Sequence, residues 1–560
     1  MFDYRVSVGK YQAGDAEPLT HICFNRLEPF SLPSLFMLLV IVPATLSTFL
    51  NGHHPLFLRL GFAFATYHGV LLTSITLYRL SPLHPLAKYP GPIRLKLSTW
   101  WVYQMATRGK RHEFIRALHE HYAADVIRTG KCLLFRPNEI SIRDASAIAP
   151  IMGPNGLPKG PMWDGRARYS TDRLLIGWRD PTMHAKRRQP WTRGLSTAAI
   201  KDYEPTLAER VTQLVDLVST RRGEIVDLAD MFRKFSFDFM GDMAFGGGFE
   251  LMRDGDVHDF MRMMQAGTKD SVLTETIPWF SYHAPTNLSA LVDAATLRAT
   301  ERIMKGTTRK DLFHYLNNDD GALELSPPLS AVIPEGALVT IAGSDTTSAT
   351  LSNALYLLLT HPNVYRRVQE EIDRFYPPDE NSLDCKFHPK MRILDAVINE
   401  TLRLYPVVPS GSQRATQRKG FHLDSCYIPP YTTVRVHTWS IHRDSRNFSP
   451  SPNSFWPDRW LIASNLNADK YHPCPETFTH NTDAFHPFSY GPANCVGKNL
   501  AMKELKMAIT HLLHRVNVRL AEGYDVREWD QGVKDFFTMD VGGLPVVISP
   551  REAEKHEAED

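Results

Sequence analysis

Residues 488–497, with the sequence FSYGPANCVG, constrain the fold of this chain more than any other stretch. Cys495 follows a loop with glycine and proline and precedes residues 498–515, whose apolar residues recur at helical spacing. The N-terminal end of that predicted helix is positive and carries free N–H groups, which favour a thiolate, the form in which sulfur binds a soft metal. Gly491 and Gly497 let the backbone fold tightly and approach a flat ligand. On its own, such a cysteine is more often a small buried hydrophobe.

A second unusual stretch lies inside the most apolar long helix predicted for the chain, residues 335–360. Residues 342–347 read AGSDTT. A glycine inside a helix costs about 0.5 to 1 kcal/mol relative to alanine, and the acid and threonines bring no packing benefit. Ala342, Gly343 and Thr346 share one side of the helix. We therefore expect a groove in which the Thr346 hydroxyl meets a ligand or bonds to a carbonyl one turn back.

The cysteine stretch resembles the haem-binding loop of the cytochrome P450 superfamily, F-x-x-G-x-R-x-C-x-G, at Phe488, Gly491, Cys495 and Gly497. The resemblance implies haem b, with Cys495 as the axial ligand of its iron. Thiolate ligation of this kind pushes electron density to iron and favours O–O cleavage. One position departs from the motif, because Ala493 stands where the family has an arginine that reaches a haem propionate.

The helical stretch is similar to the oxygen-binding motif of the same family, A/G-G-x-D/E-T-T, without departure. By this resemblance Thr346 hydrogen-bonds the bound dioxygen or its water. Asp345 then helps to relay protons from solvent, and Ala342 and Gly343 border the haem.

A basic stretch, HAKRRQPW at residues 184–191, has the form of a solvated helical face. His184 and Arg188 lie four residues apart on one side of that helix. They resemble the family's W/H-x-x-x-R pair, which binds haem propionates. Because Ala493 supplies no guanidinium, His184, Arg188 and Arg414 are the candidates to neutralise the carboxylates.

Glu400 and Arg403 lie three residues apart in a predicted helix, residues 393–405, where such a pair is usually a surface ion pair of small value. Together with WPDRW at residues 456–460, they resemble the E-x-x-R and P-E/D-R-F/W elements of the family. The resemblance makes Glu400, Arg403 and Arg459 a buried structural triad that locks the segment leading to the haem cysteine.

The motifs occur in the family's order over residues 82–550, which implies a mainly α protein with a minor β part: a cytochrome P450 fold preceded by N-terminal transmembrane segments, of the membrane-bound fungal type. We also predict a helix at residues 100–122, a hairpin of residues 131–135 with 139–143, strands within residues 427–438, and a final hairpin at residues 536–548 turning at Gly542 and Gly543.

Residues 1–80 are predicted to form a membrane anchor with one or two spans, at about 31–50 and 60–78. Cationic residues follow the second span and place that side in the cytosol, in the endoplasmic reticulum membrane by resemblance. Residues 81–550 form the predicted catalytic domain, which starts with a proline-rich spacer. Residues 551–560 are predicted to be a disordered charged tail.

Composition excludes other classes of protein. The chain has 63 Lys and Arg against 61 Asp and Glu, so no global charge attracts nucleic acid. Its six cysteines are scattered without a C-x-x-C pair, which argues against a disulfide framework and a zinc site.

The resemblance implies a monooxygenase that inserts one atom of O2 into a lipophilic substrate, with electrons from NADPH through NADPH–cytochrome P450 reductase, and a place in secondary metabolism. A terpenoid, steroid, fatty acid or aromatic substrate fits equally well. Two alternatives stay open: an isomerase or dehydratase of this family that does not use O2, and a non-catalytic haem-binding membrane protein. Basic residues near the cysteine either dock the reductase or solubilise the surface: Lys186, Arg187, Lys498, Lys503 and Lys506.

Overall fold

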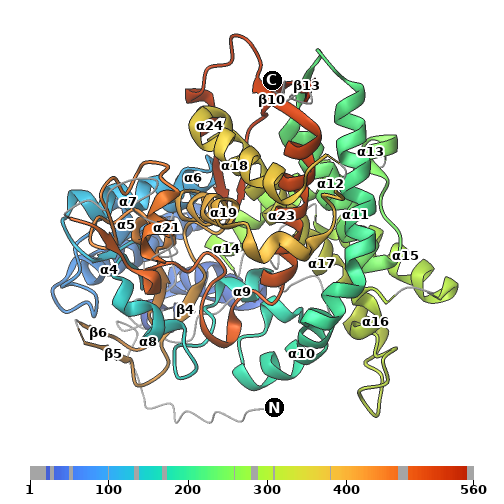
Figure 1. Cartoon of the computed structure of the whole chain (residues 1–560). Coiled ribbons are helices and arrows are strands. Elements are labelled where there is room, and N and C mark those ends of the chain that lie inside the picture. The colour runs from blue at the N-terminus through green and yellow to red at the C-terminus, as the bar shows by residue number, and fades with distance from the viewer. Residues whose placement is uncertain are drawn as a thin grey trace, which may run out of the picture. The chain divides into compact units, whose positions relative to one another are not determined.

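The helix predicted around residues 342–347 is α17 (Leu329–Thr360) in the computed structural model of the chain (Figure 1). It ends at the predicted residue but begins six residues earlier. The prediction placed the helix start after Pro334, yet this proline lies inside the helix, which continues although the missing N–H removes one backbone hydrogen bond.

Two glycines of α17 allow close packing against α12 (Leu228–Phe245). A Cβ atom at Gly336 would lie 2.7 Å from Phe245, and one at Gly343 would lie 2.5 Å from Met240. The cost of Gly343 in the helix is therefore explained by contact with a neighbouring helix as well as by the groove expected from the sequence.

The structure describes residues 20–24, 31–49, 55–98, 100–130, 138–166, 173–257, 259–278, 288–306, 310–378, 380–424, 426–464 and 477–551. It divides into two compact units. The first contains Met1–Tyr103 and Val126–Ile140, and the second contains Gln104–Asp125 and Ser141–Asp560. Residues 131–135 of the predicted hairpin, and nearly all of the predicted charged tail, lie outside the described residues.

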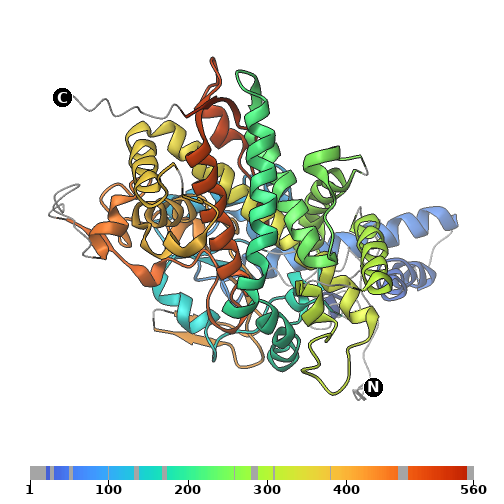
Figure 2. The same ribbon diagram turned by 45° about the vertical axis from the view of Figure 1, so that its right-hand side comes forward.

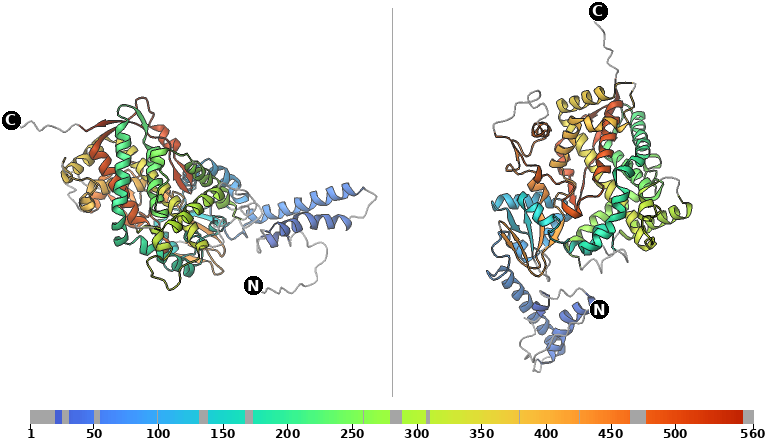
Figure 3. Two further views of the ribbon diagram at one scale, coloured as in Figure 1. Left: turned by 90° about the vertical axis from the view of Figure 1, so that its right-hand side faces the viewer. Right: turned by 60° about the horizontal axis from the view of Figure 1, so that its bottom comes forward.

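The first unit contains two helical segments that are long and apolar enough to cross a membrane, Leu32–Phe49 and Leu56–Leu80. The hydroxyl of Tyr67 donates to the carbonyl of Leu38 at 2.8 Å and so connects the two segments, which lie side by side in Figure 3. The elements of this unit are α2 (Leu32–Phe36), η2 (Met37–Ile41), α3 (Val42–Leu46), η3 (Ser47–Phe49), α4 (Leu56–Leu80), α5 (Ile93–Leu97) and β1 (Val126–Arg128), and α6 (Trp100–Thr107) and β2 (Glu139–Ile142) run across the boundary.

The second unit is built around α17, which packs against α12, α15, α19 and α23, while α11 packs between α12 and α23 (Figures 1 and 2). One large apolar core fills the space between these helices. Besides α12 and α17, the described helices of the second unit are α7 (Arg111–His121), α8 (Ile148–Met152), α9 (Met162–Arg166), α10 (Pro181–Gly194), α11 (Thr197–Thr220), α13 (Leu251–Asp254), α14 (Phe260–Thr276), α15 (Leu288–Lys305), α16 (Leu312–Leu316), α18 (Pro362–Phe375), α19 (Arg392–Leu404), α20 (Thr438–Ile441), α21 (Asp458–Ala463), α23 (Lys498–Arg515) and α24 (Arg527–Gly532).

The strands of the second unit are short and lie in small antiparallel groups: β4 (Gln413–Ala415) with β7 (Thr433–Val436), β5 (Phe421–Leu423) with β6 (Cys426–Ile428), β8 (Phe448–Ser449) with β9 (Thr479–His480), β11 (Lys534–Phe536) with β12 (Thr538–Asp540), and β13 (Pro545–Pro550) between β10 (Val516–Leu520) and β3 (Ile225–Asp227). β6 and β7 confirm the strands predicted within residues 427–438.

Two sequence predictions were wrong. The helix predicted at residues 100–122 is broken into α6 and α7 at Gly109, whose φ of +72° leaves the helical region. The final hairpin does not turn at Gly542 and Gly543. It turns at Phe537, between β11 and β12, and β13 pairs with β10 instead.

The stability of this unit is expected to fall on acidification, because buried histidines are held neutral. Burial lowers the pKa of His119 to about 4, partly offset by its 2.9 Å hydrogen bond to the carbonyl of Ala124. Its stabilising contribution is complete above pH 6.5 and is lost as the pH falls toward 4, by about 1.4 kcal/mol per pH unit. We predict that His119→Gln, which cannot titrate, reduces the loss of unfolding free energy between pH 6.5 and pH 5 by about 2 kcal/mol in denaturant titrations. His121→Gln, at an exposed site of the same helix, is the control and should leave the loss unchanged.

Candidate active site

The cysteine loop follows β9 and ends at α23, the helix predicted at residues 498–515. The Cys495 N–H donates to the carbonyl of Phe488 at 2.8 Å and closes the loop. Gly491 has a φ of +72°, and a Cβ atom there would lie 2.1 Å from the carbonyl oxygen of Met152. This position therefore requires glycine, both for its backbone conformation and for its close approach to another segment.

The Cys495 thiol is reached from the cavity that it lines, but it lies deep in the protein. Burial raises its pKa, whereas the N–H groups of Gly497 and Lys498 and the charge of Arg188 act to lower it. The N–H groups at the helix end and the charge of Arg188 thus act toward the thiolate, as the sequence predicted, while burial opposes them.

A central cavity brings most of the predicted site residues together. It lies between α10, α12, α14, α17 and the cysteine loop. Its lining includes Ala342, Gly343, Asp345, Thr346, Phe488, Cys495, Gly497, His184 and Arg188. Gly491 supports the loop from behind. Arg414 borders an adjoining surface groove that is also lined by Ala493.

Two polar side chains of α17 face this cavity. The Thr346 hydroxyl donates to the carbonyl of Ala342, one turn back, at 2.8 Å. Asp345 accepts a 3.4 Å hydrogen bond from the Thr538 hydroxyl. Burial and then the negative charge of Asp540 raise the pKa of Asp345 to about 7, against the opposing effects of Arg233 and Thr538. At neutral pH this carboxyl can both hold and release a proton.

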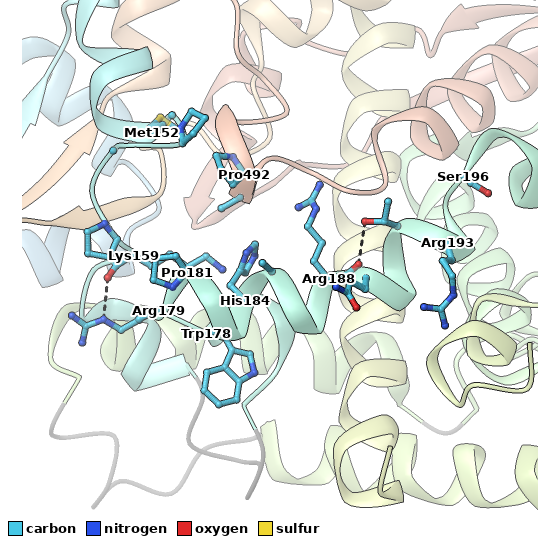
Figure 4. Close-up of a pocket in the computed structure, with 18 of the residues that line it drawn as sticks. Met152, Lys159, Trp178, Arg179, Pro181, His184, Arg188, Arg193, Ser196 and Pro492 are labelled. Atoms are coloured by element: carbon cyan, nitrogen blue, oxygen red, sulfur yellow. Dashed lines mark hydrogen bonds between the residues drawn. The ribbon is translucent and has the colours of Figure 1, made fainter. Parts of the chain in front are cut away.

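Cationic side chains converge at the opposite end of the cavity. Figure 4 shows His184 and Arg188 projecting from one side of α10 toward the segment of Pro492. Arg188 donates to both the carbonyl and the side-chain oxygen of Asn494, at 2.7 Å each. Burial, followed by the charges of Lys159 and Arg188, lowers the pKa of His184 to about 4.

Lys159 belongs to this cation cluster, although the sequence did not single it out. Its backbone pairs with that of Arg414 in an antiparallel bridge, and its ammonium donates to the carbonyl of Ile176 at 2.7 Å. Burial and then the charges of Arg414 and Arg188 lower the pKa of Lys159 to about 7. A lone lysine between prolines and glycines has no spacing signal, so only the folded chain could reveal it.

Glu400, Arg403 and Arg459 lie together, each with a fully buried side chain. Arg403 binds both carboxylate oxygens at 2.8 Å, and Arg459 binds one at 3.1 Å. The carboxylate also accepts from the Trp456 N–H at 2.9 Å and from the Trp460 indole at 3.0 Å. Arg403 in turn holds the carbonyls of residues 442, 452 and 454.

The cytochrome P450 family model matches residues 100–541 of this chain. The chain belongs to the cytochrome P450 family. This confirms the mainly α fold class and the enzyme class, an oxidoreductase of the monooxygenase type, that the motifs predicted.

Curated relatives of this P450 come from fungi. The chain is 30% identical over 548 residues to cytochrome P450 monooxygenase FCK2 of Fusarium pseudograminearum, covering 94% of this chain and 93% of the relative. It is 28% identical over 500 residues to tryprostatin B 6-hydroxylase of Aspergillus fumigatus, covering 87% and 84%. The crystal structure of cytochrome P450DA heme domain has the same fold, with a TM-score of 0.66 at 19% identity over 79% of this chain and 94% of that chain.

Membership of the P450 family implies a haem, and the residues at this site fit one. Cys495 is a soft ligand on one wall of the cavity. At the cationic end, the Nε atom of Arg414 is buried without a hydrogen-bond partner among the described atoms. Burial lowers the pKa of Arg414 to about 10. Two carboxylates placed here would satisfy this donor and relieve the repulsion among Lys159, His184, Arg188 and Arg414.

Three of the five basic residues predicted near the cysteine are engaged within the chain. Arg187 pairs with the buried Glu335 at 2.8 Å, Lys503 pairs with Glu204, and Lys506 pairs with Asp395 at 2.6 Å. Lys186 and Lys498 are the two of that set with exposed side chains. The predicted docking surface is therefore smaller than the sequence suggested.

Glu504 is a further residue at this site that sequence reasoning missed. It lies on α23, lines the central cavity and accepts from the Ser236 hydroxyl at 3.1 Å. Burial raises its pKa to about 8. The signal was present, because Glu504 falls on the same face of the predicted helix as Leu500, and an acid on an apolar face is unusual.

We predict that Glu400→Gln destabilises this P450 by about 3 to 5 kcal/mol, because the neutral amide leaves the two buried guanidinium groups without a counter-charge. Equilibrium unfolding in denaturant measures the change. The control is Glu370→Gln, which breaks the exposed pair with Arg366 on α18 and should cost less than about 0.5 kcal/mol. An equal, small loss in both variants would contradict the structural role given to Glu400.

Proposed function

We propose that this chain is a haem-thiolate monooxygenase that inserts one oxygen atom from O2 into a lipophilic organic substrate. Electrons come from NADPH through NADPH–cytochrome P450 reductase. The observation that carries the proposal is a single cavity in which a cysteine and a cation cluster suit haem b, while Asp345 and Thr346 face the same space.

Cys495, supported by the N–H groups of Gly497 and Lys498, is the residue that would bind the haem iron. Lys159, His184, Arg188 and Arg414 are the proposed partners of the two propionates, in place of the arginine that Ala493 lacks. Ala342 and Gly343 border the cofactor on the α17 side. When bound, the haem supplies the chemistry that activates oxygen.

Thr346 and Asp345 are proposed to handle the proton. The Thr346 hydroxyl can exchange its bond to the Ala342 carbonyl for one to a ligand in the cavity. Asp345, with a pKa raised to about 7, is suited to hold a proton and to release it at neutral pH. Asp540, which is part-exposed and pairs with Arg233 at 3.3 Å, lies on the solvent side of this route.

The substrate is proposed to be neutral and lipophilic. Many of the side chains that line the central cavity are apolar, among them Trp163, Ala337, Val407 and Phe537. Relatives include a protein named tryprostatin B 6-hydroxylase, which supports hydroxylation of a secondary metabolite as the reaction. The two apolar helices of the first unit are proposed to anchor the enzyme in the endoplasmic reticulum membrane, with residues 81–550 as the catalytic domain in the cytosol.

Absorbance spectroscopy tests the cofactor assignment directly. The reduced protein under carbon monoxide is expected to give the strongly red-shifted Soret band of thiolate-ligated haem. Cys495→Ser should abolish that band, whereas Cys385→Ser, which removes a half-buried cysteine outside the cavity, should keep it. Absence of the band in the wild-type protein, or its persistence in Cys495→Ser, would refute the proposal.

We predict that Thr346→Ala uncouples electron transfer from substrate oxidation. With reductase, NADPH and a lipophilic compound that binds, the variant should release several times more peroxide per NADPH than the wild type, because the hydroxyl no longer directs the proton. Thr340→Ala is the matched control. Thr340 is buried on the same helix and bonds to the carbonyl of Gly336, but it does not line the central cavity. Unchanged coupling in Thr346→Ala would contradict the role proposed for its hydroxyl, and turnover without NADPH would favour an enzyme that does not use O2.

A further inference from the structure

The hairpin of β11 and β12 reaches the central cavity with a turn of one residue. Phe536 faces Thr538 across the hairpin, which leaves Phe537 alone at the tip. Its φ is +85°, a conformation in which a bulky residue is rare and conformationally strained. A residue persists in such a conformation only where its surroundings hold it there.

The strained residue places an aromatic ring in the cavity wall. The rings of Phe537 and Trp163 meet edge to face, with centroids 5.4 Å apart and planes at 88°. Both residues line the central cavity, on the side that the proposed function assigns to substrate. The position of the Phe537 ring therefore sets the shape of that wall.

Asp535 holds the tip of the hairpin in place. One carboxylate oxygen accepts the Phe537 N–H at 3.0 Å. The other accepts the Ser410 hydroxyl at 2.5 Å, and Arg111 contacts both oxygens at 3.4 Å. The Asp535 N–H donates to the carbonyl of Gly109 at 2.7 Å. The side chain of Asp535 is fully buried.

Arg111 connects this carboxylate to a second one. It binds Glu275 of α14 at 2.7 Å, and Arg435 of β7 binds the same oxygen at 2.6 Å. Two arginines and two acids are thus buried together, joining α7, α14, β7 and the hairpin. Burying four charges is an expensive way to gain stability, and an apolar cluster of the same size would often serve as well. The geometry of the network therefore calls for a purpose other than stability.

We propose that Asp535 is a positioning residue for substrate selection in this enzyme. Its carboxylate, fixed by Arg111 and Ser410, fastens the Phe537 backbone in the left-handed conformation and so keeps the ring against Trp163 as a rigid wall. The inference rests on the proposed function, since it assigns the wall to a substrate pocket above a haem.

The test uses the full-length, haem-loaded protein and two probes, imidazole and 4-phenylimidazole, whose dissociation constants follow from shifts of the Soret band. The two probes share the imidazole ring that binds haem iron, and they differ by a phenyl ring that tests the shape of the cavity wall. Phe537→Ala should weaken 4-phenylimidazole about tenfold and leave imidazole within about twofold. Asp535→Ala should change the ratio of the two constants in the same direction, by at least about fivefold.

The double variant separates positioning from a merely structural role. With the ring absent, the clamp has nothing to position, so Asp535→Ala combined with Phe537→Ala should give the ratio of Phe537→Ala alone. The control is Asp311→Ala, which removes another buried aspartate that binds an arginine, Arg302, and a backbone N–H. It should leave the ratio unchanged.

Two further measurements keep the test decisive. Ser410→Ala removes one hydrogen bond from Asp535 and should shift the ratio of the two dissociation constants in the same direction but less. This variant replaces Asp535→Ala in the test if that variant does not fold. Backbone hydrogen exchange of residues 534–541 should be faster in Asp535→Ala and in Ser410→Ala than in Asp311→Ala. A wild-type protein without a Soret response refutes the proposed function, whereas a normal wild-type response with unchanged ratios in Asp535→Ala or Ser410→Ala refutes the clamp alone.

Discussion

The buried carboxylate of Glu400 organises the contacts that hold the loop of Cys495 in place. It accepts five hydrogen bonds, two from Arg403 on the same helix, α19, and three that join α19 to residues 456–460. The Trp460 ring then packs against Phe485, with centroids 4.5 Å apart, three residues before the cysteine loop begins. A second support comes from His442, whose carbonyl is held by Arg403 and whose ring accepts the N–H of His486 at 3.2 Å. The loop is thus held through contacts that extend outward from one buried carboxylate.

At the cationic end of the cavity, positive side chains lie together without an acidic partner among the described ion pairs. In many folds buried arginines lie beside acids, as Arg403 does, but Arg414 and Lys159 have only carbonyl oxygens as partners among the described hydrogen bonds. Their lowered pKa values express the cost of that arrangement. The cation cluster explains how Ala493 can stand where the family motif has an arginine. Lys159 and Arg414 approach the same space from a different part of the fold. A fifth cation would add to the repulsion.

The sequence predicted what depends on local order and missed what depends on contacts between distant segments. The helices α17, α19 and α23 were placed to within one residue at their C-terminal ends, since periodic apolar residues define all three and a proline follows α17 and α19. The turn at Phe537 was missed because a glycine pair nearby has the better turn chemistry, while the real turn is stabilised by Arg111 from the other end of the chain. The burial that raises the pKa of the Cys495 thiol is likewise a property of the folded cavity and not of the loop, so the sequence could not reveal it.

Exclusion of water from the cavity affects several titratable side chains of this site in the same way. The same loss of solvation raises the pKa of Asp345 to about 7 and that of Glu504 to about 8, and it also raises the pKa of the Cys495 thiol. A wall that let water in would remove these shifts, because a solvated carboxyl returns to its ordinary pKa. The rigid contact between Phe537 and Trp163 closes part of that wall. If Asp535 fixes this wall as proposed, the buried charges around it also act on Asp345, because a closed wall keeps water from this carboxyl and so preserves its raised pKa.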